Sequence, residues 1–291
     1  MTMFVTAIEH VAQFVRPIHF ITRNYDSNVV KPGAATLFFV NADGWAFTCG
    51  HVADEIITAG QVNDRYKSFR TELASLKDPN RRARRDLAKR FGYASKVTCQ
   101  VQVRLVGCGF GLVNINVRRH KLYDIALLQL TPAPKLQVLA SFGKNGDDIK
   151  QGKYLCRMGF PFPEFTNFQF DAASDNIEWT QTGEENTPRF PLEGMITRHL
   201  LDSGVIVGFE MSTPGLRGQS GGPAFDVNGT IWGMQFQTAH LDLNFDVDQE
   251  VLRNGTLERR RDSAFLHVGH CFHVEILKQF MRAEGVAFAE A

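Results

Sequence analysis

The stretch of this sequence that most constrains its fold reads Gly218-Gln219-Ser220-Gly221-Gly222-Pro223. A serine hydroxyl is a weak nucleophile at neutral pH. It needs a base to take its proton and donors for the negative charge that forms on a substrate oxygen. Glycine on both sides of Ser220 lets the backbone turn tightly, so that consecutive N–H groups point to one spot. The pattern predicts Ser220 as a nucleophile and the N–H groups of Gly218 and Ser220 as an oxyanion hole, although such strings are also typical of plain turns.

A second motif lies far upstream and reads Phe47-Thr48-Cys49-Gly50-His51-Val52. It follows a predicted hairpin, in which residues 35–40 and 45–48 flank the turn Asn41-Ala42-Asp43-Gly44. A histidine at the end of a strand can be held rigidly enough to act as a base, although a lone histidine is more often structural. Because adjacent strand residues point to opposite faces, we expect Cys49 to face the core.

The third motif is Tyr123-Asp124 at the head of the apolar run 125–130. An acid in that position is partly buried and needs a partner, and an imidazolium is such a partner. The alternative is an aspartate that caps a turn. The order along the chain decides between these interpretations, because His51, Asp124 and Ser220 follow the order of the chymotrypsin type of catalytic triad.

With these motifs in this order, the chain resembles the trypsin-like serine proteases of the chymotrypsin fold (PA clan). Among them it is most similar to the high-temperature-requirement bacterial proteases without their PDZ modules. The resemblance extends from about Val15 to Gly285. It implies an all-β fold of two packed six-stranded antiparallel β-barrels with the triad in the cleft between them. Further similar stretches are residues 157–162, 193–197, 229–234 and 268–285.

We therefore predict a single peptidase domain over residues 1–291. Its first barrel spans residues 12–131 and its second barrel spans residues 151–272. A connecting segment that contains proline and glycine joins the two barrels. A helix over 273–284 closes the chain, because its apolar residues recur at helical spacing. Further strands are predicted over 97–106, 205–209 and 230–236, and a long polar loop over 165–191.

Residues 63–91 interrupt the strand pattern with two predicted short helices around Asp78-Pro79-Asn80. This segment holds ten Lys and Arg residues against four acids. One interpretation is a basic surface that docks a protein partner, and the other is a solvated helical insertion that only faces water. In both interpretations, the insertion would project from the first barrel at a point in the sequence between His51 and Asp124.

The resemblance also locates the pocket for the side chain that precedes the scissile bond. No acid lies at its expected base, so a buried cationic side chain would lack a counterion there. We predict a small or apolar side chain at this position rather than Arg or Lys. The predicted substrate-binding residues are Pro214, Gly215, Leu216, Gln235, Phe236 and Gln237.

The composition limits the remaining possibilities. A formal net charge of +1 argues against nucleic acid and anionic membranes as partners. The five cysteines include no Cys-x-x-Cys pair, which indicates free thiols in a reducing compartment. No secretory signal and no membrane-spanning run is evident. We therefore expect a cytoplasmic protein. The stretch His267-x-x-His270-Cys271-x-His273 holds ligand types, but we assign it to a strand and predict no metal site and no cofactor.

These observations predict a serine endopeptidase that acts on a protein or peptide through an acyl-enzyme. A variant of this prediction is a latent protease that a partner protein activates. The rival is a protease-fold peptide-binding or scaffolding module that docks through residues 63–91. A complete triad argues against the rival, because a pure binder does not need all three residues. The sequence makes no prediction of the oligomeric state.

Overall fold

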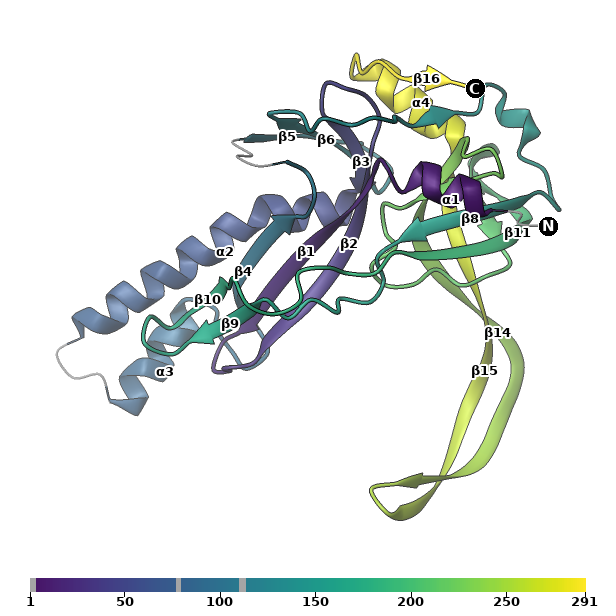
Figure 1. Cartoon of the computed structure of the whole chain (residues 1–291). Helices are drawn as coiled ribbons and strands as arrows, with labels where there is room; N and C mark the ends of the chain where they lie inside the picture. The colour runs from purple at the N-terminus through teal and green to yellow at the C-terminus, as the bar shows by residue number, and fades with distance from the viewer. Residues whose placement is uncertain (1–3, 77–79, 110–113) are drawn as a thin grey trace.

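A computed structural model describes residues 4–76, 80–109 and 114–291 of the chain. Two antiparallel β-sheets form the body, a two-helix arm projects from the first sheet and a long β-hairpin projects from the second (Figure 1). This architecture confirms the predicted fold class. Asp78 and Pro79, the centre of the predicted turn between the arm helices, lie outside the described residues.

The first sheet has six strands in the order β4-β1-β2-β3-β6-β5, and each neighbouring pair is antiparallel. In the part of the chain that is described, β4 and β5 end this order, so the sheet is a half-barrel. The predicted strands of this half are all present. The bounds are β1 Val15–Asn24, β2 Val30–Phe39, β3 Trp45–Cys49, β4 Thr98–Leu105, β5 Asn114–Arg119 and β6 Ile125–Thr131.

The second sheet contains a closed ring of six antiparallel strands. It closes because the short strand β13 pairs with β8 on one side and with β14 on the other. Two short strands, β7 (Ser141–Phe142) and β16 (Ala289–Glu290), extend the sheet in parallel, and a 3-10 turn (Gly146–Asp148) follows β7. The ring strands are β8 Tyr154–Gly159, β11 Phe190–Asp202, β12 Val205–Met211, β13 Pro223–Phe225, β14 Ile231–Arg253 and β15 Thr256–His273.

One apolar core joins the two sheets. Phe38 and Phe47 of the first sheet have ring centroids 5.6 Å apart, and Phe142 of β7 lies 6.3 and 6.4 Å from them. All three rings are fully buried. The helices α1 (Val5–Val11) and α4 (Val274–Ala283) add side chains to the same cluster, and α4 is the helix predicted at the end of the chain.

The helical insertion consists of α2 (Gly50–Ser75) and α3 (Arg81–Arg90). The prediction of only short helices was wrong, because α2 is one continuous helix of 26 residues that starts beside His51. Gly60 does not break it, since a single glycine costs a helix only about 1 kcal/mol. The arm also has its own small core, which contains Tyr66, Phe69, Leu87, Ala88, Tyr93 and Cys99.

The predicted loop over 165–191 contains a hairpin instead, formed by β9 (Phe168–Asp171) and β10 (Asn176–Trp179). Its strands were missed because their apolar cluster is small, with Phe165 and Ile177 packed on Ile21, and much of the attachment is polar, as in the ion pair of Asp175 with Arg23 at 2.9 Å. A segment of the second sheet therefore reaches across to the first sheet and its arm.

The hairpin of β14 and β15 was not predicted at its full length. The prediction ended a strand at residue 236, whereas cross-strand pairing continues from the barrel to Arg253 and Thr256 at the tip. Beyond the barrel it is a two-stranded ribbon whose apolar side chains, such as Leu252 and Leu257, are about two-thirds exposed. None of the helices in the described ranges is long and apolar enough to cross a membrane.

We expect Phe47→Ala to lower the free energy of unfolding by about 3–5 kcal/mol, because it removes a fully buried ring from the core shared by the sheets. Urea denaturation followed by circular dichroism measures this loss. The matched control is Phe245→Ala, whose ring is 57% exposed on the projecting hairpin and whose loss should stay within about 0.5 kcal/mol. Equal losses in both variants would contradict the shared core.

Candidate active site

His51 and Asp124 are brought together by the pairing of two neighbouring strands. Cys49 at the end of β3 lies opposite Ile125 at the start of β6. The residues just beyond these ends are His51, in the first turn of α2, and Asp124. The N–H of Gly50 also donates to the backbone carbonyl of Asp124 (3.1 Å), which fixes the two chain segments at this point.

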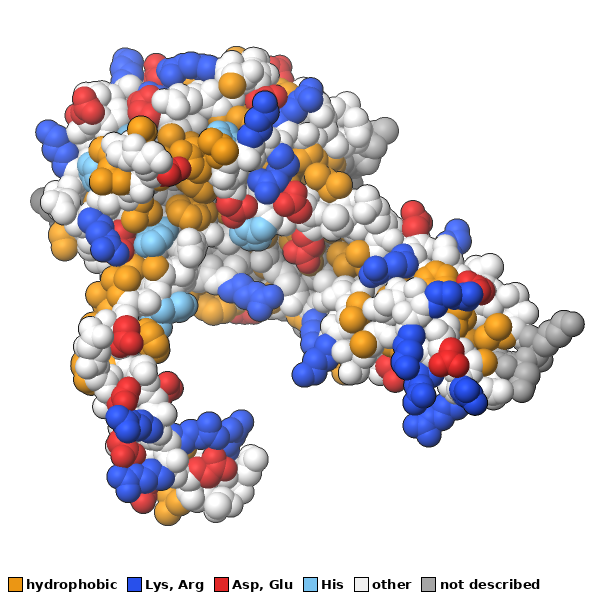
Figure 2. All heavy atoms as spheres, turned by 180° about the vertical axis from the view of Figure 1, so that it is seen from behind, with side chains coloured by type: hydrophobic (Ala, Val, Ile, Leu, Met, Phe, Trp, Pro, Cys, Tyr) orange, Lys and Arg blue, Asp and Glu red, His pale blue; other side chains and the backbone are white. Residues whose placement is uncertain are grey.

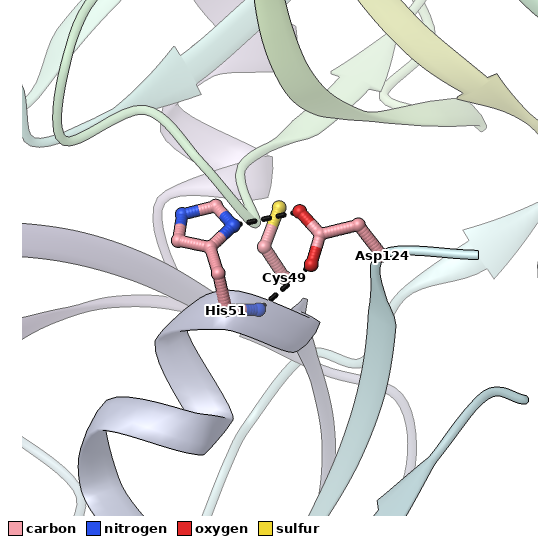
Figure 3. Close-up of side chains that lie close together, drawn as sticks. All are labelled: Cys49, His51 and Asp124. Carbon is pink, nitrogen blue, oxygen red and sulfur yellow. Dashed lines mark hydrogen bonds and ion pairs between the residues drawn. The ribbon is translucent and has the colours of Figure 1, made fainter. Parts of the chain in front are cut away.

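Asp124 holds His51 at two points (Figure 3). One carboxylate oxygen accepts the backbone N–H of His51 at 2.7 Å, and the other lies 2.6 Å from the ring Nδ1. The carboxylate thereby fixes the orientation of the ring and selects the tautomer with hydrogen on Nδ1. The predicted pairing of these two residues is therefore present in the structure.

The electrostatics of this pair follow from the same contacts. The hydrogen bond to Asp124 raises the pKa of His51, against the opposing effect of burial. Burial alone would raise the pKa of Asp124, but the hydrogen bonds from the side chain and backbone of His51 bring it below its usual value. The pair therefore stabilises a positive charge on the imidazole, which a general base acquires when it takes a proton.

Ser220 lies on the turn between β12 and β13, and Thr36 of β2 locks this turn to the first sheet. The backbone N–H of Thr36 donates to the carbonyl of Ser220 (3.1 Å), and its hydroxyl donates to the carbonyl of Gly218 (2.8 Å). A Cβ on Gly221, which has φ +87°, would lie 2.2 Å from the Thr36 carbonyl oxygen. Glycine after the serine is thus required for this close approach.

Ser220 and His51 line the same two cavities, of about 480 and 450 Å³. Within the described ranges, no hydrogen bond joins the Ser220 hydroxyl to His51. The structure thus brings all three predicted triad residues to one place, where the serine and the histidine line shared cavities.

The predicted oxyanion hole has a suitable backbone. Gly218 has φ +102°, and a Cβ there would lie 2.5 Å from the carbonyl oxygen of Phe160, so glycine is needed. Among the residues described, the N–H groups of Gly218 and Ser220 donate to no other protein group. Both donors therefore remain available for the charge on a substrate oxygen.

Gln219 between them is completely buried and braces the turn. Its Oε1 accepts the N–H of Leu216 at 3.1 Å, and its Nε2 donates to the carbonyl of Phe190, also at 3.1 Å. The sequence analysis did not assign a role to this residue. An amide can do both tasks because it carries a donor and an acceptor.

Five of the six predicted substrate-binding residues line the 450 Å³ cavity beside Ser220. Pro214 does not line it, and its carbonyl accepts from Arg157 Nη2 at 3.0 Å instead. The cavity is narrow at Gly215, whose carbonyl accepts the hydroxyl of Thr238 at 2.6 Å. The lining residues found by the prediction are Gly215, Leu216, Gln235, Phe236 and Gln237, and those that it missed are Arg217, Thr238 and His240.

Arg157 lies beneath this cavity and was also missed as a site residue. It is fully buried on β8, and its guanidinium donates to Gln235 Oε1 and to the carbonyl and hydroxyl of Thr213 (2.9 and 2.7 Å). Burial lowers its pKa, and no carboxylate pairs with it among the described residues. An arginine inside the apolar run 154–159 was the sequence signal that could have identified it.

The histidines of the stretch 267–273 do not converge. His267 lies with its Nδ1 2.5 Å from Nδ1 of His240 on the hairpin, whereas His270 lies 3.4 Å from Glu210. His273 is buried and accepts the N–H of Glu275 at the start of α4 (3.2 Å). All five cysteines are free and buried.

Comparison with known proteins gives three findings. The family model of the trypsin-like peptidase domain matches residues 35–234, more than half of the chain. No curated protein matches the sequence. A solved structure of AlgW, an HtrA-type protease determined with a tripeptide, is similar with 12% sequence identity and a TM-score of 0.49. This match covers 95% of the present chain and 62% of the AlgW chain.

We expect Asp124→Asn to lower the pKa of His51, because a neutral amide no longer stabilises the imidazolium, whereas in the native protein this pKa lies above its ordinary value. An NMR titration of the imidazole C–H signals measures the shift, with His51→Gln identifying the signal among nine histidines. Asp54→Asn is the control, since Asp54 pairs with Arg119 instead. An unchanged His51 titration in Asp124→Asn would contradict the assigned pairing.

Proposed function

Because the chain belongs to the trypsin-like peptidase family, we propose that it is a serine endopeptidase with Ser220 as nucleophile, His51 as general base and Asp124 as the residue that orients the base. One observation carries the proposal. Asp124 binds His51 through two hydrogen bonds, and His51 lines the cavity that Ser220 also lines. A histidine oriented in this way and facing a serine in a glycine-rich turn is the arrangement that acyl transfer requires.

The proposed reaction has two halves. Ser220 Oγ attacks the peptide carbonyl while His51 Nε2 takes the hydroxyl proton, and the N–H groups of Gly218 and Ser220 hold the resulting oxyanion. The imidazolium returns its proton to the leaving amine, so the C–N bond breaks and an acyl-enzyme remains. Water then attacks this ester with His51 again as base, and the acid product leaves. No cofactor takes part in these steps.

The contact between Ser220 and His51 must tighten during catalysis, since no hydrogen bond joins them in the described residues. Such bonds are often loose without substrate and form in the complex. Substrate binding beside Gly215 or a partner that shifts the nucleophile turn would supply this movement. This supports the variant in which a partner activates the enzyme.

The segment 160–190 offers a physical connection for such activation. It begins at Phe160, packed against Gly218, and it ends at Phe190, whose carbonyl accepts from Gln219. Between these points its hairpin rests on the arm, where the Asp175 carboxylate accepts the Tyr66 hydroxyl at 2.7 Å. A partner that moved the arm would therefore pull on the turn that carries Ser220.

The arm also carries the charge that a partner would meet (Figure 2). Arg81, Arg85 and Lys89 of α3 are exposed and have no ion pair within the described part of the chain, so they favour an acidic protein surface. The same feature supports the alternative function, a protease-fold module that binds peptides or scaffolds partners through the arm. The paired His51 and Asp124 favour the enzyme over that alternative.

For specificity we propose a small or apolar side chain before the scissile bond. The close packing of Gly215 against Gln235 and Thr238 supports this, because that wall of the cavity has no space for a long side chain to enter. The buried guanidinium of Arg157 lies behind Gln235 and would repel a substrate Lys or Arg. The charge near the pocket and the packing of its wall thus both favour a small or apolar side chain.

The first test is labelling with a fluorophosphonate probe. We expect the native protein to react, and Ser220→Ala and His51→Ala to lose labelling by about 10⁴-fold or more, because the nucleophile and its base act as a unit. Ser263→Ala on the projecting hairpin is the control and should label normally. If the native protein does not label even when a partner binds the arm, the binding-module function is favoured instead.

We expect the labelling rate of the native protein to fall as the pH falls, because only neutral His51 can accept the serine proton. The pKa of His51 is raised above the usual value of about 6.5. The midpoint of this acid-side decline in the labelling rate should therefore lie above pH 6.5. A pH–rate profile of labelling measures this midpoint. A rate that rises as the pH falls would contradict His51 as the base.

Thr238→Ala should widen the cavity, because it removes the hydroxyl that binds the Gly215 carbonyl. We expect preference to shift from Ala toward larger apolar residues before the scissile bond, by a factor in the range of about 10–200 that one methylene is worth in such pockets. Profiling with a peptide library measures the ratio, with Thr256→Ala at the hairpin tip as the control. A native profile dominated by Arg or Lys would contradict the assignment.

A further inference from the structure

We propose that Cys49, His51 and Asp124 form an inhibitory binding site for a thiophilic divalent cation, with Zn²⁺ as the ion that fits it best. The consequence for activity rests on the proposed function, because the ion would occupy the general base. The three side chains converge from the end of β3, the first turn of α2 and the residue before β6 (Figure 3).

The ligand atoms already lie close together. The Cys49 sulfur, a His51 ring nitrogen and an Asp124 oxygen are all within 4.8 Å of one another. Zinc bonds of about 2.0–2.3 Å in a tetrahedral site place neighbouring ligand atoms about 3.5 Å apart, so small side-chain movements would complete the coordination. In the described ranges, no other three residues of the His, Cys, Asp and Glu types converge in this way.

The thiol is placed where a ligand is needed and is not required elsewhere. Cys49 is fully buried, and its sulfur donates to the carbonyl of Gln235 at 3.3 Å. That carbonyl also accepts the N–H of Gly221 at 2.9 Å, so it stays satisfied when the thiol proton is lost. A thiolate selects zinc or cadmium over magnesium and calcium, which prefer oxygen ligands alone.

An ion can reach this position and be neutralised there. The side chains of His51 and Asp124 are 54% and 32% exposed, and His51 also lines the substrate cavity, so two of the three ligands meet solvent while the sulfur is buried on the inner side. One thiolate and one carboxylate balance the two charges of the ion. The neighbouring Arg119 does not compete for Asp124, because it already binds Asp54 through hydrogen bonds of 3.0 and 3.1 Å.

Binding would change the proton positions as follows. The Cys49 thiol loses its proton to solvent, and the proton on His51 Nδ1 moves to Nε2, so that Nδ1 can donate its lone pair to the metal. A His51 with hydrogen on Nε2 cannot accept the proton of Ser220. The ion therefore stops the proposed base without touching the nucleophile.

The experiment compares the native protein with Cys49→Ala and with Cys99→Ala, which removes a buried thiol of the arm core instead. Each protein is stripped with EDTA and titrated with Cd²⁺, whose bond to a thiolate absorbs in the ultraviolet. Fluorophosphonate labelling is then measured with Zn²⁺, with Mg²⁺ and after renewed EDTA. The absorption readout does not depend on activity.

We expect the absorption band in the native protein and in Cys99→Ala but not in Cys49→Ala. Zn²⁺ should suppress labelling reversibly in the first two proteins, and its apparent affinity should fall by more than about tenfold in Cys49→Ala, since loss of a ligand exceeds loss of an outer-shell partner. Mg²⁺ should have no effect. A band that survives in Cys49→Ala, equal zinc inhibition of that variant, or no band in the native protein would overturn the site. If the native protein fails to label both alone and with a partner bound to the arm, the proposed function fails while the absorption titration still decides on the metal.

Discussion

The position of Ser220, the proposed nucleophile, depends on Thr36, a fully buried residue of the first sheet that binds the turn of the second. Its N–H and hydroxyl hold the carbonyls on both sides of Gln219, and its own carbonyl accepts the hydroxyl of Thr48 at 2.8 Å. These bonds lie inside a core that excludes water, where each is expensive to leave unmade. The two sheets cannot slide past one another without breaking them, so the cavity at their junction keeps its shape.

The base is held by equally local means. The register of β3 against β6 places His51 beside Asp124, and the carboxylate then fixes the ring from two directions. The serine and the base thus come from different sheets, and each is rigid within its own. Thr36 links the two sheets at the turn that carries Ser220, and Gln219 ties the same turn to Phe190 at the end of the segment 160–190.

Charge is distributed unevenly around this centre. Among the described residues, the buried Arg157 beneath the proposed specificity cavity has no carboxylate partner, and Arg81, Arg85 and Lys89 are exposed on α3 without an ion pair. A buried cation is costly, so its retention beside the pocket wall fits a role in excluding cationic substrates. The arm cations lie on a surface that the hairpin of segment 160–190 connects to the nucleophile turn. In the proposed function, positive charge therefore acts on substrate choice at one place and on partner binding at another.

The sequence by itself determined the identity of the chemical groups and the class of fold. Ser220, His51 and Asp124 stood out because each lies in a motif whose local backbone needs are strict, namely glycine at a tight turn or a strand end. Several strands of both sheets (β2, β3, β4, β6, β12 and the start of β14) and the last helix were also predictable, because their apolar patterns are local, whereas β1, β5 and β8 were not predicted. Only the tertiary structure decided the rest. The lock formed by Thr36, the bracing by Gln219 and the burial of Arg157 depend on partners between about 30 and 180 positions away. The length of α2 and of the β14–β15 hairpin, and the β9–β10 strands, were missed because long-range packing rather than local composition sets where such elements end.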